Sequence, residues 1–269
     1  MKIAGFTLVA VASFPLVAVG QEAEVSRYHE RTDGVVTIHS PNGPVPVTSE
    51  HDATIAVEFV SADSMHAWYE TLEIASVSPV AEARPETTGA LNQLFVLRSD
   101  SRGHVSALST PAFPDSFDGV TDLTGQFFDF FPSRPAGGYD VGVTWTDTLV
   151  APASDNPDED VSLTKISEYV VEGRSTANGV PTFLIRADAR LEVRAEGALP
   201  NQPGLRVITT MEGLETNEFI VAQANGRMLL RTRSAELSGR MEYIGMPQAV
   251  VLDVSRSYEN EIRLVEGGD

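Results

Sequence analysis

Residues 183–196 read Phe-Leu-Ile-Arg-Ala-Asp-Ala-Arg-Leu-Glu-Val-Arg-Ala-Glu, and this stretch decides which fold the sequence predicts. Its odd-numbered positions are all apolar, and its even-numbered positions after Leu184 are all charged. Alternation with a period of two is typical of a β-strand with one face toward water and one toward a core. The fourteen residues span about 45 Å at roughly 3.4 Å per residue, well beyond the usual strand of about 5–6 residues. The sheet that contains this strand is therefore expected to be large.

The sequence on both sides of this stretch also predicts strands joined by short turns. Asn178-Gly179 and Asn225-Gly226 are strong hairpin signals, and consecutive strands joined in this way normally pair antiparallel. The expected strands cover residues 35–39, 53–59, 68–74, 91–98, 104–108, 141–150, 161–172, 183–196, 205–214, 219–222, 227–237 and 250–264. Lys165 breaks the alternation of its strand, which predicts an irregularity there, and Arg256 and Asn260 interrupt the apolar face of the last strand.

The middle of the chain departs from this β pattern. Apolar residues from Val120 to Phe131 fall near helical spacing and include four phenylalanines in five residues, and Pro132 ends the run. A long sheet with one apolar face must cover that face or close on itself, and the small side chains of Ala187 and Ala189 leave room for another element. The sequence therefore predicts a mainly β fold, in which a large curved antiparallel sheet (a half-barrel or open barrel) wraps around one short Phe-rich helix at about residues 119–131.

The first twenty residues are expected to be a secretory signal peptide. Lys2 provides a positive charge, residues 3–19 are apolar, and Ala18-Val19-Gly20 fits a small-residue cleavage site. A membrane anchor is the alternative, although the apolar stretch is at the short end for a span. The mature chain, residues 21–269, is expected to be exported, either periplasmic or secreted, and to form a single β-rich domain. A subdivision near residues 110–140 stays open.

Composition excludes several classes of function. The formal net charge of −19 argues against nucleic acid and anionic membrane surfaces as partners, because both require basic patches. The absence of cysteine excludes disulfides and cysteine-based metal or redox sites. No second apolar stretch is long enough for a transmembrane helix, so we expect no stable membrane insertion of the mature chain.

No catalytic residue, metal site or cofactor site is predicted. The five histidines, at positions 29, 39, 51, 66 and 104, match no metal-binding motif. The acidic loop 155–160 is oxygen-rich but lacks the EF-hand pattern, and we interpret it as solvated, with cation binding left open. The acidic cluster 115–118 precedes the expected helix, where its dipole favours negative charge. The alternating charges of residues 186–196 are interpreted as a solvent-facing row with cross-strand pairs.

The layout of signal peptide, β segments, Phe-rich helix and long C-terminal meander resembles the half-barrels of periplasmic lipoprotein carriers and uncharacterised exported bacterial β-rich proteins. The resemblance covers architecture alone, since no motif matches. The residues themselves favour a non-enzymatic exported protein that binds a lipid, another apolar ligand or an apolar partner segment in the concave face of the sheet. The candidate ligand-binding residues are Phe127, Phe131, Ala187, Ala189 and Leu191. The alternatives are a secreted hydrolase that uses carboxylates and a small outer-membrane β-barrel; the oligomeric state is not predicted.

Overall fold

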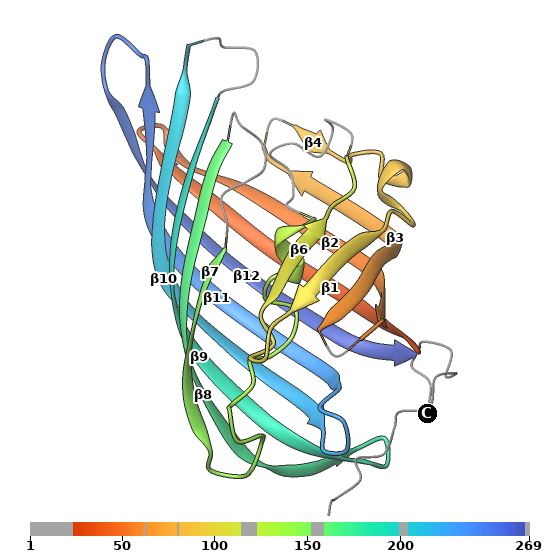
Figure 1. Ribbon diagram of the computed structural model, residues 1–269. Helices are drawn as coiled ribbons and strands as arrows, with labels where there is room; N and C mark the ends of the chain where they lie inside the picture. The colour runs from red at the N-terminus through yellow and green to blue at the C-terminus, as the bar shows by residue number, and fades with distance from the viewer. Residues whose placement is uncertain are drawn as a thin grey trace, which may run out of the picture.

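The computed structural model describes residues 24–61, 63–79, 81–113, 123–151, 159–198 and 204–266. These residues form one antiparallel sheet of twelve strands (Figure 1). The strands are β1 (Val25–Ser40), β2 (Gly43–Phe59), β3 (Ser64–Val77), β4 (Glu82–Ala83), β5 (Phe95–Ser99), β6 (Val105–Ser109), β7 (Thr144–Ala151), β8 (Glu159–Ala177), β9 (Val180–Ala198), β10 (Arg206–Ala222), β11 (Met228–Ile244) and β12 (Val250–Glu266). The expected signal peptide, the cluster 115–118 and most of the loop 155–160 lie outside the described residues.

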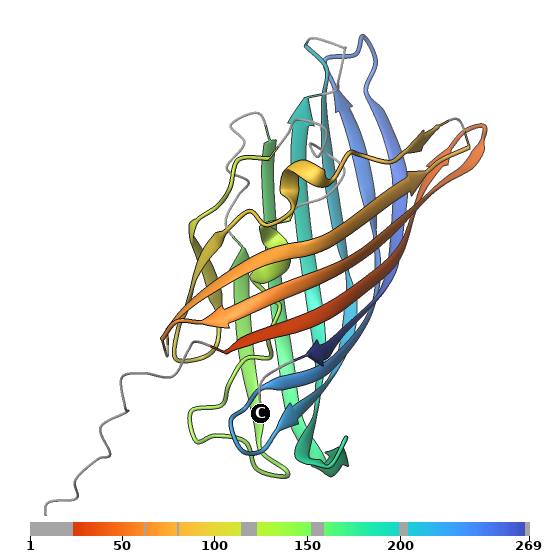
Figure 2. The same ribbon diagram turned by 90° about the vertical axis from the view of Figure 1, so that its right-hand side faces the viewer.

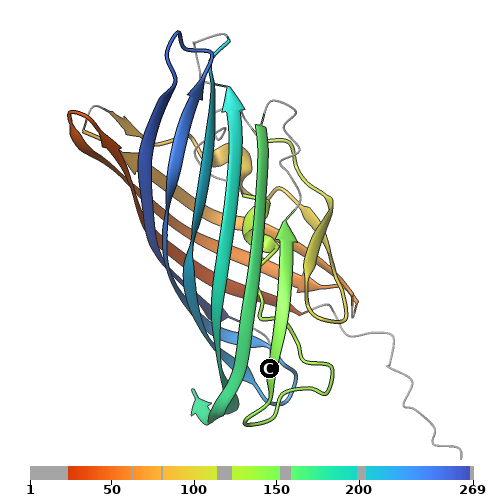
Figure 3. The same cartoon turned by 90° about the vertical axis from the view of Figure 1, so that its left-hand side faces the viewer.

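The sheet is open, and the N-terminal and C-terminal strands pair with each other in its middle. The strand order is β6-β5-β3-β2-β1-β12-β11-β10-β9-β8-β7, so the first strand pairs with the last, and β6 and β7 form the free edges. The long strands β8 to β12 make a curved wall (Figure 3), and β1, β2 and β3 cross obliquely over its concave side (Figure 2). The predicted large curved antiparallel sheet is confirmed.

Strand β9 contains the stretch that predicted the fold, and its two faces are as expected. The side chains of Phe183, Ile185, Ala187, Ala189 and Leu191 are buried, whereas the charged residues between them are exposed. The buried face belongs to the concave side, which also holds the Phe-rich segment, so the charged row lies on the outer face. Several of its charges pair with a neighbour two residues along the same strand, such as Arg186 with Asp188 at 3.1 Å.

Two of the predicted hairpin turns join long strands. Asn178 and Gly179, with φ angles of 50° and 82°, connect β8 to β9, which is the left-handed conformation that a two-residue hairpin requires and that Asn-Gly adopts readily. Asn225-Gly226 lies between β10 and β11, where Gly226 has a φ of 72°. Residues 205–214 and 219–222, expected to be separate strands, are continuous in β10.

The Phe-rich segment is less helical than expected. Within residues 123–131 the structure has a single turn of 3-10 helix, η3 (Gly125–Phe127), and the preceding part of the expected helix lies outside the described residues. Gly125 lowers helix propensity, and the carbonyl of Asp129 accepts a hydrogen bond from the Arg231 guanidinium rather than from a helical N–H. A second 3-10 turn, η1 (Thr88–Ala90), precedes β5.

The interior has two apolar layers. The larger layer includes the rings of Tyr28, Tyr69, Phe95, Phe127 and Phe130, and the smaller one comprises Ala189, Leu191, Met211, Ala235, Leu237 and Val254. Buried charged and polar side chains accompany these layers. Lys165 is one of them: its strand keeps its pairing register at this position, and the register shift lies between Val171 and Gly173. The predicted irregularity at Lys165 is therefore wrong, because the side chain follows the alternation and points inward.

Candidate functional site

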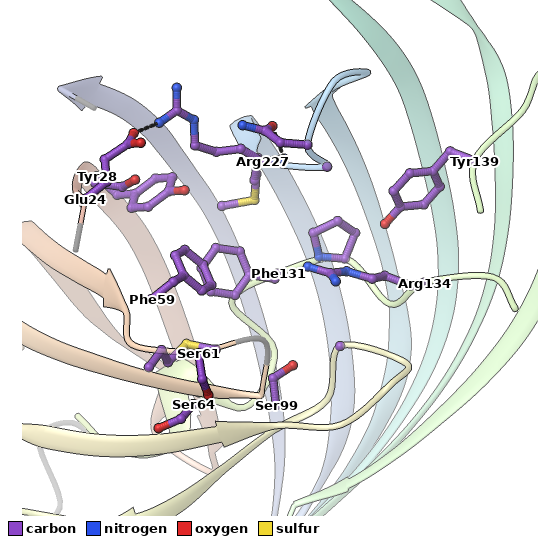
Figure 4. Close-up of a pocket in the computed structure, with 17 residues that line it drawn as sticks. Glu24, Tyr28, Phe59, Ser61, Ser64, Ser99, Phe131, Arg134, Tyr139 and Arg227 are labelled. Carbon is purple, nitrogen blue, oxygen red and sulfur yellow. Dashed lines mark hydrogen bonds and ion pairs between the residues drawn. The ribbon is translucent and has the colours of Figure 1, made fainter. Parts of the chain in front are cut away.

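A cavity of about 390 Å³ lies at one end of the half-barrel, where the turns β2–β3, β5–β6 and β10–β11 meet (Figure 4). Its apolar wall is formed by Tyr28, Phe59, Met65, Phe131 and Met228. The Phe131 ring is the centre of this wall, with ring centroids 6.0 Å from Tyr28 and 5.9 Å from Phe59. The volume falls in the range of about 300–1,000 Å³ that is typical of small-molecule sites.

The rest of the lining is polar and contains two arginines. Arg227 is paired with Glu24, and Figure 4 shows Arg134 and Tyr139 across the cavity from Tyr28. Serines 26, 61, 64 and 99 also line it. Within the described part of the chain, Glu24 is the only acidic residue of the lining. Burial raises the pKa of Tyr139 to about 12, so its phenol is a hydrogen-bond donor at neutral pH.

The backbone holds Arg134 at the cavity wall. Its N–H donates to the carbonyl of Arg102 at 2.7 Å, and its side-chain stem passes over Gly103. A Cβ added at Gly103 would lie 3.6 Å from Arg134 Cγ and 3.3 Å from the Pro132 carbonyl oxygen, and Gly103 has a φ of +88°. Position 103 therefore favours glycine, both for its positive φ and for the close approach of the Pro132 carbonyl.

The five candidate ligand-binding residues are spread over the interior. Phe131 borders the cavity. Phe127 and Ala187 belong to the larger apolar layer, and Ala189 and Leu191 belong to the smaller one. The structure thus places Phe131 at a cavity and the other four in packed regions, and their part in ligand binding stays a prediction.

A buried ionic network connects the Phe-rich segment to the sheet. Asp129 Oδ2 accepts a hydrogen bond from Lys165 Nζ at 2.7 Å and another from Arg231 Nη2 at 3.0 Å. Lys165 also donates to Glu215, and Arg233 Nη1 lies 3.5 Å from Asp129 Oδ2. Asn217 accepts from Arg231 at 3.0 Å and the hydroxyl of Tyr258 donates to Glu215 at 2.5 Å. We call this set, Asp129, Lys165, Glu215, Asn217, Arg231, Arg233 and Tyr258, the ionic network.

Both carboxylates of the ionic network stay ionised. Burial raises the pKa of Asp129, but the charges of Lys165 and the two arginines outweigh it and hold the pKa well below its ordinary value. Burial likewise raises the pKa of Glu215, and Arg233 and Lys165 lower it more. Neither group can therefore act as a general acid near neutral pH. A space of about 10 Å³ beside Asp129 and Lys165 has room for about one water.

Two further polar groups involve histidines. His51 is buried with its Nε2 atom 3.7 Å from Glu30 Oε2, and burial lowers the pKa of its imidazole despite that carboxylate. His104 lies between two acids, with Nε2 2.6 Å from Asp147 Oδ2 and Nδ1 3.2 Å from Asp100 Oδ2. Since His104 precedes β6 and Asp147 belongs to β7, this contact bridges the two free edges of the sheet. Among the described residues, no group of three or more His, Asp or Glu side chains is arranged to hold a metal ion.

Neither the ionic network nor the cavity arginines were predicted from the sequence. Lys165 interrupts an apolar face of its strand, and Glu215 and Asn217 fall between two expected strands, so their burial was not predicted. For the cavity no such signal exists, because its lining comes from turns that are distant in sequence.

Comparisons with known proteins give weak resemblances. No protein-family profile matches the chain, and no curated protein matches it in sequence. Neisserial surface protein A is similar over 89% of this chain and 98% of its own, at 8% identity and a TM-score of 0.22. The outer-membrane protein OmpT of Vibrio cholerae is similar over 90% and 100%, at 9% identity and a TM-score of 0.23. A DUF1329 family protein of Desulfovibrio piger is similar over 90% and 87%, at 8% identity and a TM-score of 0.15.

These solved structures are bacterial outer-membrane barrels and one DUF1329 protein, and at such low TM-scores they assign neither a family nor an activity to this chain. No helix in the described residues is long and apolar enough to cross a membrane.

Proposed function

We propose that this chain is an exported, non-enzymatic protein that binds a small apolar or amphipathic ligand in the cavity at the end of its half-barrel. The observation that carries the proposal is the cavity itself, with an aromatic wall and about 390 Å³ of space. Mostly apolar pockets with a few placed polar groups are the usual form of small-molecule sites. Export is inferred from the N-terminal sequence pattern.

The chemistry of the interior favours this proposal over a carboxylate-dependent hydrolase. Such an enzyme needs two carboxyl groups beside one substrate, one of them with a raised pKa. Asp129 and Glu215 share Lys165 as a partner, but the pKa of each is lowered. The space beside Asp129 is about 10 Å³, far smaller than a sugar ring.

The outer face of the sheet favours a protein surrounded by water over a small outer-membrane barrel. The row from Arg186 to Arg194 is exposed there, and an arginine facing lipid at the bilayer midplane costs about 2–4 kcal/mol. The sheet is also open, since β6 and β7 are not paired with each other. Fractionation of cells that express the full chain tests this alternative, and recovery in the outer membrane rather than in the soluble fraction would establish it.

Binding of the uncharged fluorophore N-phenyl-1-naphthylamine to the purified protein tests the proposed function. We expect saturable enhancement of fluorescence, and a loss of affinity of about two- to tenfold in Phe59→Ala, because an aromatic contact is worth about 0.5–1.5 kcal/mol. Phe59 is 41% exposed, so its truncation should leave the fold intact. Leu108→Ala is the matched control, since Leu108 is 61% exposed and does not line the cavity. Absence of saturable binding, or equal losses in both variants, would refute the proposal.

A further inference from the structure

The two sides of the cavity differ in chemistry, and the difference indicates which ligand it binds. The rings of Tyr28, Phe59 and Phe131 form one side, and Arg134 lies on the other (Figure 4). An apolar wall alone would bind apolar molecules without distinguishing among their head groups. A positive charge in the lining of the same space favours a molecule that has an apolar body and a negatively charged head.

Arg134 is available for such a head group. In the described part of the chain no carboxylate lies within ion-pair distance of its guanidinium, although the chain has 38 acidic residues. The second cavity arginine, Arg227, is already paired with Glu24. An anion entering the cavity would therefore meet one arginine that is paired with no carboxylate of the described residues.

The main chain of Arg134 is anchored at the cavity wall, and its side chain is exposed. Its N–H donates to the carbonyl of Arg102 at 2.7 Å, and its side-chain stem passes close to Gly103. A planar guanidinium in this position can donate two parallel hydrogen bonds to a carboxylate or phosphate.

We infer that the cavity binds an amphiphile with an anionic head, a carboxylate or a phosphate, which pairs with Arg134 while its apolar chain packs against Phe59, Phe131 and Tyr28. This inference rests on the proposed function and adds to it the charge and place of the head group.

Displacement of bound N-phenyl-1-naphthylamine by three ligands with the same twelve-carbon chain tests the inference: dodecanoate, dodecyl phosphate and the uncharged 1-dodecanol. We expect Arg134→Gln to weaken the two anions by about 10- to 100-fold, the range for losing a charge-assisted hydrogen bond, and to change 1-dodecanol by less than about twofold. Whichever anion loses more identifies the head group as carboxylate or phosphate.

Two matched variants complete the test. Arg190→Gln removes the same charge from the exposed outer face of β9 and should leave all three affinities unchanged. Arg134→Lys keeps the charge without the planar fork and should retain part of the anion affinity. The inference is overturned if 1-dodecanol binds wild-type protein as tightly as dodecanoate, or if Arg134→Gln weakens all three ligands equally. Those outcomes leave the cavity as an apolar site, whereas failure of all ligands to bind refutes the proposed function itself.

Discussion

Asp129→Asn is expected to destabilise the protein by about 3 kcal/mol, because Asp129 anchors the Phe-rich segment inside the sheet. Its carboxylate pairs with Lys165 at 2.7 Å and with Arg231 at 3.0 Å, and these two cations are 3% and 1% exposed. Removing one partner of a buried ion pair costs about 3–5 kcal/mol. The lower end applies here, because Lys165 keeps Glu215 and the asparagine oxygen still accepts a hydrogen bond.

Urea denaturation followed by far-ultraviolet circular dichroism measures this free energy of unfolding. A second readout is local: the indole N–H of Trp145 donates to Ser133 at 2.8 Å, just beyond the Phe-rich segment. In a Trp68→Phe background, a red shift of Trp145 emission would report loosening of this segment before global unfolding. Asp188→Asn is the control, since Asp188 pairs with Arg186 on the exposed outer face and such pairs are worth about 0–1 kcal/mol.

The reasoning is refuted if Asp129→Asn costs less than about 1 kcal/mol, or no more than Asp188→Asn. Either result would mean that aromatic packing holds the segment and that the ionic network adds nothing to it.

Three further predictions concern acid, histidine and backbone crowding. The pKa values of Asp129 and Glu215 are lowered in the folded state. Their stabilising contribution is therefore complete above the unfolded pKa values of about 3.9–4.3 and is lost as the pH falls below them toward the folded values. The denaturation midpoint should therefore fall less on acidification in Asp129→Asn than in the wild-type protein. Burial lowers the pKa of His51, so its contribution is present above about pH 6.5 and declines below it, and His51→Gln should flatten the stability profile between about pH 7 and 5. Gly213→Ala should lower the free energy of unfolding by about 1–3 kcal/mol, measured by thermal or urea unfolding, because its Cβ would lie 2.1 Å from the Glu236 carbonyl oxygen. Gly173→Ala is the control, with no atom within 4 Å of the added Cβ, and should cost far less. Equal losses in the two variants would contradict the explanation by steric crowding.

The sequence predicts the sheet well because a β-strand with one solvent-exposed face and one buried face has alternating polar and apolar residues. Strand β9 alternates without interruption from Ile185 to Arg194, and Asn178-Gly179 has the turn conformation that its residue types favour. The strand boundaries were less accurate where an inward-facing residue is polar. The expected strands 205–214 and 219–222 leave out Glu215 and Asn217, and both are buried within β10.

Lys165 shows why the ionic network could not be predicted. Its position in the alternation is inward, but the apolar Ile166 falls on the opposite face from Leu163 and Tyr169, so an irregular strand was the simpler interpretation. The acids that neutralise it, Asp129 and Glu215, are 36 and 50 residues away. A single sequence contains no information about contacts at such distances, and the same limit applies to the turns that form the cavity.

The pairing of β1 with β12 imposes an order on how the chain assembles. Glu30 is hydrogen-bonded to Asn260, 230 residues further along, and this seam joins two halves that each consist of neighbours in sequence. Each half can form from its own hairpins. The pairing of β1 with β12 requires contact between segments at opposite ends of the chain, and such non-local contacts form slowly. Until the ribosome has released residues 250–266, the first strand has one vacant hydrogen-bonding edge. The finished architecture therefore depends on β12, and removal of this strand would separate the two halves rather than shorten one of them.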